Sequence, residues 1–173
     1  LALIRRIRPL SAIFYIMTLF PGTDLYDDFK ARTGIDDDIW LQRIEDILYF
    51  EHDPEMDQAV IRDFGRRLRS TYHQLLPEFA RRIELKKDQD LTKYQAGFLS
   101  RLGMTFSHGD YAAIGTVIDT SRVALELYKR ALSLYPDHRA YWAMAMVYQR
   151  QNQWDRAIDI LNIGLANFPK SEE

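Results

Sequence analysis

The sequence predicts a mainly α-helical protein in which one strand, a turn and a short helix precede antiparallel helices and a C-terminal helical hairpin. Three observations support this fold class. Apolar residues recur at helical spacing over most of the 173 residues. A nearly continuous apolar run at residues 12–20 stands apart from them. Two stretches near the C-terminus repeat each other with an offset of 33 residues.

The composition limits the classes of function. The chain is 47% hydrophobic and 28% charged, with a formal net charge of −2, as in soluble globular proteins. This charge offers no electrostatic case for nucleic acid or an anionic membrane as partner. The lack of cysteine excludes a disulfide framework, a thiolate nucleophile and an iron–sulfur cluster held by this chain. A cytoplasmic location is the default expectation.

The N-terminus suggests a piece of a longer polypeptide, because the chain begins at Leu1 without an initiator methionine. Arg5, Arg6 and Arg8 before the apolar run imitate the start of a signal peptide. No small-residue cleavage site follows, however, and about ten apolar residues are too few to cross a bilayer, which takes roughly 20. We therefore predict no membrane segment, and a secreted protein with an uncleaved leader is the weakest alternative.

Residues 12–20 are expected to form a strand that is covered on both faces, as in a parallel sheet, because the run does not alternate. Pro21 and Gly22 then end the strand. No other segment has a strand-like pattern, so we expect the neighbouring strands to lie outside this chain. Without them, the run should be frayed, pair with another copy of the chain, or lie against the helices in a non-native way.

A short helix over residues 25–31 follows the turn. Thr23 or Asp24 can cap its N-terminus, and Gly34 would end it in the left-handed conformation.

Further helices occupy the middle of the chain. Three adjacent acids, 36–38, start an amphipathic helix that is predicted to run through Leu48. After Pro54, apolar residues recur every four positions, which predicts one long helix. Pro77 is expected to start the next helix, because proline suits a first turn. After the charged segment 86–90, another row with a spacing of four is formed by Tyr94, Phe98, Leu102 and Phe106.

The C-terminal stretch 139–169 is predicted to form two helices separated by a polar turn at 151–153. Its second helix matches the upstream stretch 123–136. The paired positions are Ala124, Tyr128, Ala131, Leu132 and Pro136 with Ala157, Leu161, Gly164, Leu165 and Pro169. This pattern resembles a tetratricopeptide repeat, whose period is 34 residues. In the upstream unit, segment 107–122 displaces the first helix, so we count about one and a half repeats.

The tetratricopeptide resemblance implies a binding surface, because the first helix of each repeat lines a concave groove in that family. Tyr141, Met144, Ala145 and Tyr148 fit the helix-packing positions of this first helix. The residues that would face a peptide or protein partner are Arg139, Trp142, Met146, Gln149 and Arg150. Trp and Arg are frequent in protein interfaces. Trp142 could equally pack on a neighbouring helix, and both readings stay open.

The N-terminal segment resembles the end of a radical S-adenosylmethionine (radical SAM) barrel of the type often fused to a cobalamin-binding domain. The resemblance is carried by residues 14–20, Pro21-Gly22-Thr23, Leu25-Tyr26, Lys30 to Gly34, and Trp40. The helical stretch 50–85 is also similar to the region after such barrels. The defining C-x3-C-x2-C cluster loop is absent. The resemblance therefore implies only the C-terminal part of such an enzyme, which is not catalytic alone.

Cofactors follow from the same resemblance. It implies an iron–sulfur cluster and S-adenosylmethionine for the full-length protein, with cobalamin in the cobalamin-dependent type, and no cofactor bound by this chain alone. Barrel chemistry occurs at the carboxyl ends of the strands, so Leu19, Phe20, Pro21 and Gly22 would lie near bound S-adenosylmethionine or substrate. Alternatively, this segment only turns the chain.

Within this chain, no catalytic residue and no metal site are predicted. The four histidines show no metal-ligand spacing, and the acids 36–38 lack the glycine and glutamate of a calcium loop. Neither a phosphate-binding glycine loop nor a nucleophile elbow occurs. The basic runs 66–69 and 81–87 fit a solvated helix face or a phosphate-contacting patch.

Two functional hypotheses follow. In the first, residues 1–50 end a radical SAM-type barrel, residues 51–92 connect, and residues 93–173 form a tetratricopeptide-like region for protein interaction. The rest of the parent polypeptide would then be one partner. In the second, the chain is a free-standing tetratricopeptide-like scaffold that binds a peptide or another protein.

Overall fold

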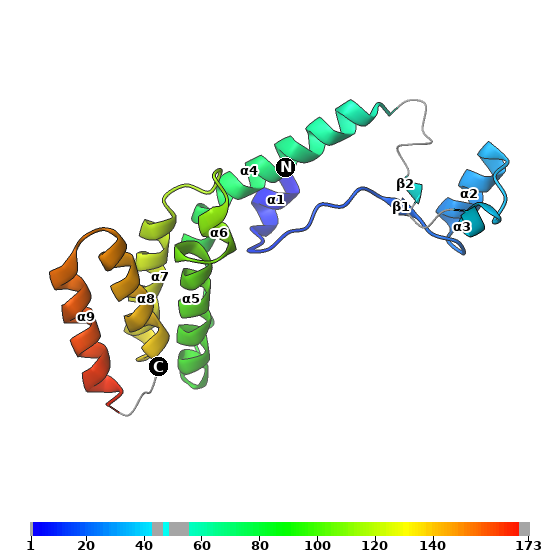
Figure 1. Ribbon diagram of the computed structural model, residues 1–173. Helices are drawn as coiled ribbons and strands as arrows, with labels where there is room; N and C mark the ends of the chain where they lie inside the picture. Colours follow the sequence, from blue (N-terminus) through cyan, green and yellow to red (C-terminus); the bar gives the residue numbers. More distant parts are fainter. Residues whose placement is uncertain (1, 43–46, 49–55, 170–173) are drawn as a thin grey trace. The chain divides into compact units, whose positions relative to one another are not determined.

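The computed structural model describes residues 2–42, 47–48 and 56–169 (Figure 1). The prediction of a mainly α-helical fold is confirmed. The chain divides into two compact units: one is Ser11–Arg69, and the other joins Leu1–Leu10 to Ser70–Glu173. The predicted domain divisions after residues 50 and 92 rest on resemblance and stay predictions.

The only sheet in the described ranges is a two-residue pairing. Strand β1 (Thr18–Leu19) lies antiparallel to β2 (Ile47–Leu48), with Thr18 opposite Leu48. The prediction of a strand over 12–20 with no partner in this chain is therefore wrong, and so is the prediction of helix through Leu48. β-Branched Ile47 fits a pleated strand at least as well as a helix.

Residues 12–17 form neither helix nor strand and expose most of their apolar side chains. Tyr15 is 85% exposed, and Ile13 and Met17 are more than half exposed. The expectation that both faces of this run are covered is wrong for the chain as it stands. The exposure agrees with the expectation that a frayed apolar run results when its covering polypeptide lies elsewhere.

Helix α2 (Asp24–Thr33) has the caps that the sequence predicts. The Thr23 side chain accepts a hydrogen bond from the Tyr26 backbone N–H at 3.3 Å. Gly34 ends the helix at φ 67°, in the left-handed region, and its N–H donates to the Lys30 carbonyl.

A small core holds α2 against α3 (Ile39–Gln42). Leu19, Tyr26 and Phe29 are almost fully buried in it. The Trp40 indole N–H donates to the Tyr26 hydroxyl at 2.9 Å, and this hydroxyl donates to Asp37 at 2.8 Å. Asp37 also pairs with the Lys30 ammonium, and this hydrogen bond lowers the pKa of Asp37.

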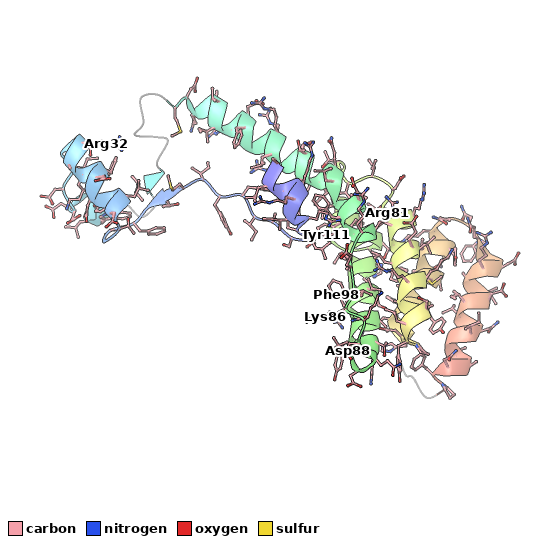
Figure 2. All side chains as sticks on the ribbon, turned by 180° about the vertical axis from the view of Figure 1, so that it is seen from behind. Arg32, Arg81, Lys86, Asp88, Phe98 and Tyr111 are labelled. Atoms are coloured by element: carbon pink, nitrogen blue, oxygen red, sulfur yellow. The ribbon has the colours of Figure 1, made fainter. Side chains whose placement is uncertain are left out.

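Helix α4 (Gln58–Arg81) continues through Pro77, so the prediction that a new helix begins at this proline is wrong. Proline lacks a backbone N–H, so α4 loses one hydrogen bond in the turn before Pro77 and continues for four further residues to Arg81. An ion pair holds the C-terminal end of α4, where Arg81 lies (Figure 2). In this pair, Arg81 Nε donates to Glu126 Oε2 at 2.6 Å. The segment after α4 then runs back along α5, where Gln95 donates to the Lys86 carbonyl (Figure 2).

The remaining helices of the second unit are α1 (Ala2–Ile7), α5 (Thr92–Ser107), α6 (Asp110–Ala113), α7 (Thr120–Leu134), α8 (His138–Arg150) and α9 (Trp154–Asn167), with a 3₁₀ turn at Gln89–Leu91. Helices α5, α7, α8 and α9 run side by side, and α9 lies at one edge (Figure 1). Helix α6 is tied to the N-terminal segment, because the Tyr111 hydroxyl donates to the Leu10 carbonyl.

Helices α5 and α7 form one hairpin, and α8 and α9 form a second. In α5, Leu99, Leu102, Gly103 and Phe106 have the large–large–small–large spacing of Tyr141, Met144, Ala145 and Tyr148 in α8. The first helices are 42 residues apart and the second helices 33, so the first hairpin has nine extra residues in its connection, which contains α6. The prediction that the upstream unit lacks a first helix needs correction in one respect, because α5 pairs with α7 and completes a hairpin there.

Small residues let the paired helices approach closely. A Cβ added at Gly103 would lie 2.5 Å from the Tyr128 ring, and one added at Gly164 would lie 3.0 Å from the Cβ of Tyr141. The buried Tyr128 hydroxyl is hydrogen-bonded to Ser107 Oγ at 2.8 Å. Burial raises the pKa of Tyr128 to about 12.

Candidate protein-binding site

A groove of about 280 Å³ lies between α8 and α9, and we call it the interhelix groove. Both helices supply apolar side chains to its walls. Its lining consists of Trp142, Ala145, Met146 and Gln149 from α8 with Trp154, Ala157, Ile158 and Leu161 from α9. One carboxamide, on Gln149, is the only polar side chain in this lining.

Large apolar side chains in the interhelix groove remain exposed. Trp142 is 46% exposed, Trp154 is 55% exposed and Ile158 is 57% exposed. In α9 the only buried residue is Ala157, whereas each of α5, α7 and α8 buries several. A contiguous exposed apolar patch of this kind is typical of protein interaction sites.

Helical spacing brings these side chains together. In α8, Trp142, Met146 and Gln149 are separated by four and three residues, so they share one helix face. In α9, Trp154, Ile158 and Leu161 have the same separation. The turn between the helices reverses the chain at Asn152, which has φ 58°, as Asn tolerates better than most residues.

The five predicted partner-contacting residues divide into three groups. Trp142, Met146 and Gln149 line the interhelix groove. Arg139 is exposed on the same helix but lines hollows beside α5 instead. The Arg150 guanidinium donates to the Ser107 carbonyl and thereby ties the end of α8 to the end of α5.

Trp142 combines the two roles that the sequence leaves open. Its ring packs edge-on against His108, with ring centroids 5.8 Å apart at 89°. Nearly half of the side chain nevertheless remains exposed. It is therefore held in place on one side and available on the other, which is favourable for a rigid aromatic contact residue.

His108 packs against Trp142, and its surroundings disfavour the charged imidazolium. Its Nδ1 lies 2.6 Å from Ser107 Oγ, and its buried Nε2 has no hydrogen-bond partner among the described residues. Burial, and secondly the positive charge of Arg150, lower the pKa of His108 from its ordinary value of 6.5.

Stability should therefore fall on mild acidification. Below pH 6.5 the unfolded chain takes up a proton on His108 before the folded chain does, so the free energy of unfolding decreases as the pH falls toward the folded-state pKa. Well above pH 6.5, His108 is neutral in both the folded and the unfolded chain, so it no longer makes the free energy of unfolding depend on pH. Urea unfolding at pH 7.5 and pH 5.5 should show a smaller pH difference for His108→Gln than for the parent. Equal differences would contradict this assignment.

Three exposed apolar residues of the groove, all in α9, were not predicted as contacts. Leu161 was matched only to a position of the repeat pattern, and neither Trp154 nor Ile158 was named as a partner contact. Within the described residues, nothing covers this side of α9, so all three are exposed. The available signal was that apolar residues continue around α9 beyond one face, from Trp154 to Leu165.

The predicted cofactor-contacting residues lie in the other unit. Leu19 is completely buried against Tyr26 and Phe29, whereas Phe20 is 54% exposed. Pro21 and Gly22 are exposed, and Gly22 has φ 81°, which favours glycine in this turn. A role of these residues beside a cofactor stays a prediction.

Across residues 2–42, 47–48 and 56–169, no three His, Asp or Glu side chains gather as metal ligands would. Among the helices that the structure describes, none combines the length and apolar content of a bilayer crossing.

The helices that form the interhelix groove lie in a segment that matches a known family. A family model described as tetratricopeptide repeat matches residues 122–173, which include α8, α9 and nearly all of α7. Neither the curated proteins nor the solved structures contained a match to the chain. The interhelix groove thus lies wholly within a segment that is similar to tetratricopeptide repeats.

Proposed function

We propose that the chain is a protein-interaction module and that its interhelix groove receives a helical segment of a partner protein. The observation that supports this most is the exposure of Trp142, Trp154 and Ile158, which line one groove between α8 and α9. An amphipathic helix can lay its apolar face into a hydrophobic groove of this kind.

The first hairpin supplies a template for the occupant. Helix α8 packs against α7, the second helix of that hairpin. Tyr128 of α7 is fully buried, whereas Leu161, 33 residues later in α9, is 40% exposed. The position of α9 that corresponds to the buried Tyr128 is thus partly uncovered in the described structure. A helix with the character of α8, rich in buried alanine, would suit it.

A peptide with the sequence of α8, residues 138–150, is therefore a suitable probe. Added to the full chain with labelled indoles, it should shift the NMR signals of Trp142 and Trp154 in a saturable manner. The Trp40 indole, which belongs to the other unit, should not respond. Trp154→Ala should lower the affinity for the peptide by about tenfold, because aromatic anchors carry much of the binding energy of such interfaces.

Stability measurements serve as the control. Trp154 is more than half exposed, so Trp154→Ala should change the free energy of unfolding by less than about 0.5 kcal/mol. A titration in which all three indoles shift equally, or in which Trp154→Ala binds as the parent does, would refute groove binding.

We also propose that the chain is the C-terminal region of a radical SAM enzyme. The resemblance around Pro21-Gly22-Thr23 supports this, together with the exposed apolar side chains of Ile13, Tyr15 and Met17, which suit burial by further polypeptide. The chain has no cysteine and does not fit an iron–sulfur cluster by itself. The cluster, S-adenosylmethionine and, in one type, cobalamin would be bound by preceding polypeptide.

The coding sequence tests this second proposal. An in-frame extension upstream of Leu1 should contain C-x3-C-x2-C on the order of 200 residues earlier, given the length of such a barrel. A start codon directly before Leu1 would exclude it and would leave the free-standing scaffold. Placement in the cytoplasm remains a prediction under either proposal.

A further inference from the structure

A second hollow of about 420 Å³ lies where the first turns of α5 meet the connection between α7 and α8, and we call it the basic cavity. Helix α5 contributes Lys93, Gly97 and Arg101, and the start of α8 contributes Arg139. No residue lines both this cavity and the interhelix groove. The two sites can therefore be altered separately.

The cations of the basic cavity are not neutralised by nearby acids. Among the described residues, no ion pair involves Lys93, Arg101 or Arg139. The one acid in the lining is Asp137, which is nearly buried and caps α8 by accepting the Arg139 backbone N–H at 2.9 Å. With three cations and one carboxylate, the lining has an excess of positive charge.

The cavity also has aromatic walls. Tyr94 and Tyr135 are exposed there. Phe168 completes the lining and is held in place, because its ring packs edge-on against His138 at 5.8 Å and against Tyr141 at 6.4 Å. Exposed aromatic rings beside arginines are a favourable surface for an aromatic or large apolar side chain.

Gly97 keeps the floor of the cavity open. A Cβ at this position would lie 3.5 Å from Arg101 Nη1 and 3.6 Å from Asp137 Oδ2. Both charged groups thus border the space above the glycine. A methyl group would fit at ordinary contact distance, whereas a larger side chain would project into the cavity.

We propose that the basic cavity is a second binding site, for an acidic peptide segment that carries an aromatic or large apolar side chain. Carboxylates of the peptide pair with Arg101 and Arg139, whose planar guanidinium groups suit carboxylate geometry. The aromatic side chain packs against Tyr94 and Tyr135. The site extends the proposed function, because it gives the module a partner chemistry that the apolar groove does not provide.

A designed pair of peptides tests the charge requirement. The probe is a fluorescein-labelled peptide of four glutamates and one phenylalanine, and its match contains four glutamines and one phenylalanine. With the full chain, polarisation should show at least tenfold tighter binding of the glutamate peptide. Its affinity should fall as NaCl is raised, because salt screens interactions between exposed charges.

Variants locate the site. Arg101→Gln and Arg139→Gln should each lower the affinity for the glutamate peptide by about tenfold. This change corresponds to the loss of one charge-assisted hydrogen bond. Lys129→Gln removes an exposed cation of α7 that does not line the cavity and should have no effect. Gly97→Leu should abolish binding by filling the cavity, whereas Gly97→Ala should retain most of it.

Several outcomes would overturn the proposal. These are equal binding of the two peptides, an effect of Lys129→Gln as large as that of Arg101→Gln, or tighter binding of a single-stranded oligonucleotide, which would indicate a nucleic-acid surface. Full displacement by millimolar phosphate would reduce the cavity to a small-anion site. Ile158→Asp should leave the glutamate peptide unaffected, so failure of the interhelix groove and failure of the basic cavity remain distinguishable.

Discussion

Gly103→Ala should lower the free energy of unfolding of the helical unit by about 1–3 kcal/mol, as overpacking of a core usually does. The added Cβ would lie 2.5 Å from one carbon and 2.9 Å from another of the Tyr128 ring. This ring is fully buried and hydrogen-bonded to Ser107, so it cannot move away without other changes. Denaturant unfolding followed by circular dichroism measures the loss.

Gly97→Ala is the matched control for this substitution, because it lies six residues earlier in the same helix. Its Cβ would meet neighbours only at ordinary contact distances. Alanine should therefore stabilise α5 by up to about 1 kcal/mol through helix propensity alone. If both variants shift stability in the same direction and by the same amount, the close contact between α5 and α7 is not present.

Phe29→Ala should lower the free energy of unfolding of the unit Ser11–Arg69 by about 3–5 kcal/mol, which is the largest effect that we expect. Phe29 is one of three almost fully buried side chains in its core, beside Leu19 and Tyr26. A core this small has little stability to lose, so we expect this unit to unfold. The helices from α5 to α9 should remain folded, because none of them contributes to that core.

The Trp40 indole reports this loss directly, since its N–H is hydrogen-bonded to Tyr26. Its NMR signal should move to the unfolded position in Phe29→Ala, while the signals of Trp142 and Trp154 stay in place. Tyr15→Ala also removes an aromatic ring, but an exposed one, and should change stability by no more than about 0.5 kcal/mol. Simultaneous loss of all three folded indole signals would contradict two separate cores.

Most helices could be predicted because their signals are local. The caps of α2 at Thr23 and Gly34 and the reversal between α8 and α9 follow from residue types that favour those conformations. The pairing of β1 with β2 could not be predicted, because its register joins residues that are 30 and 28 positions apart, Thr18 with Leu48 and Leu19 with Ile47. Continuous apolar runs are ambiguous without such tertiary information.

The row over α5 was predicted, but its role as the first helix of the upstream hairpin was missed for a geometric reason. A strict four-residue row rotates by roughly 40° per step around a helix with 3.6 residues per turn. Tyr94 at one end of the row is therefore exposed, while Phe106 at the other end is buried. The repeat pattern runs instead through Leu99 and Gly103, and the nine extra residues before α7 hid its period.

The candidate sites were predictable only in part. Trp142, Met146 and Gln149 follow from the repeat pattern and do line one groove. The α9 side of that groove depends on what covers the last hairpin, which no local pattern reveals. The basic cavity brings together cationic residues from α5 and α8. Two of them, Lys93 and Arg139, are 46 positions apart in the sequence. Only the folded arrangement of the hairpins shows that they meet.

Site-specific photo-cross-linking in the native polypeptide tests most directly whether the interhelix groove binds protein. A photoreactive residue at position 158, inside the groove, is compared with one at the exposed position 129 on α7. Groove binding predicts a discrete cross-linked partner from position 158, absent from position 129 and lost when Trp154→Ala is added. Equal cross-linking from both positions, or a product that persists in Trp154→Ala, would contradict it.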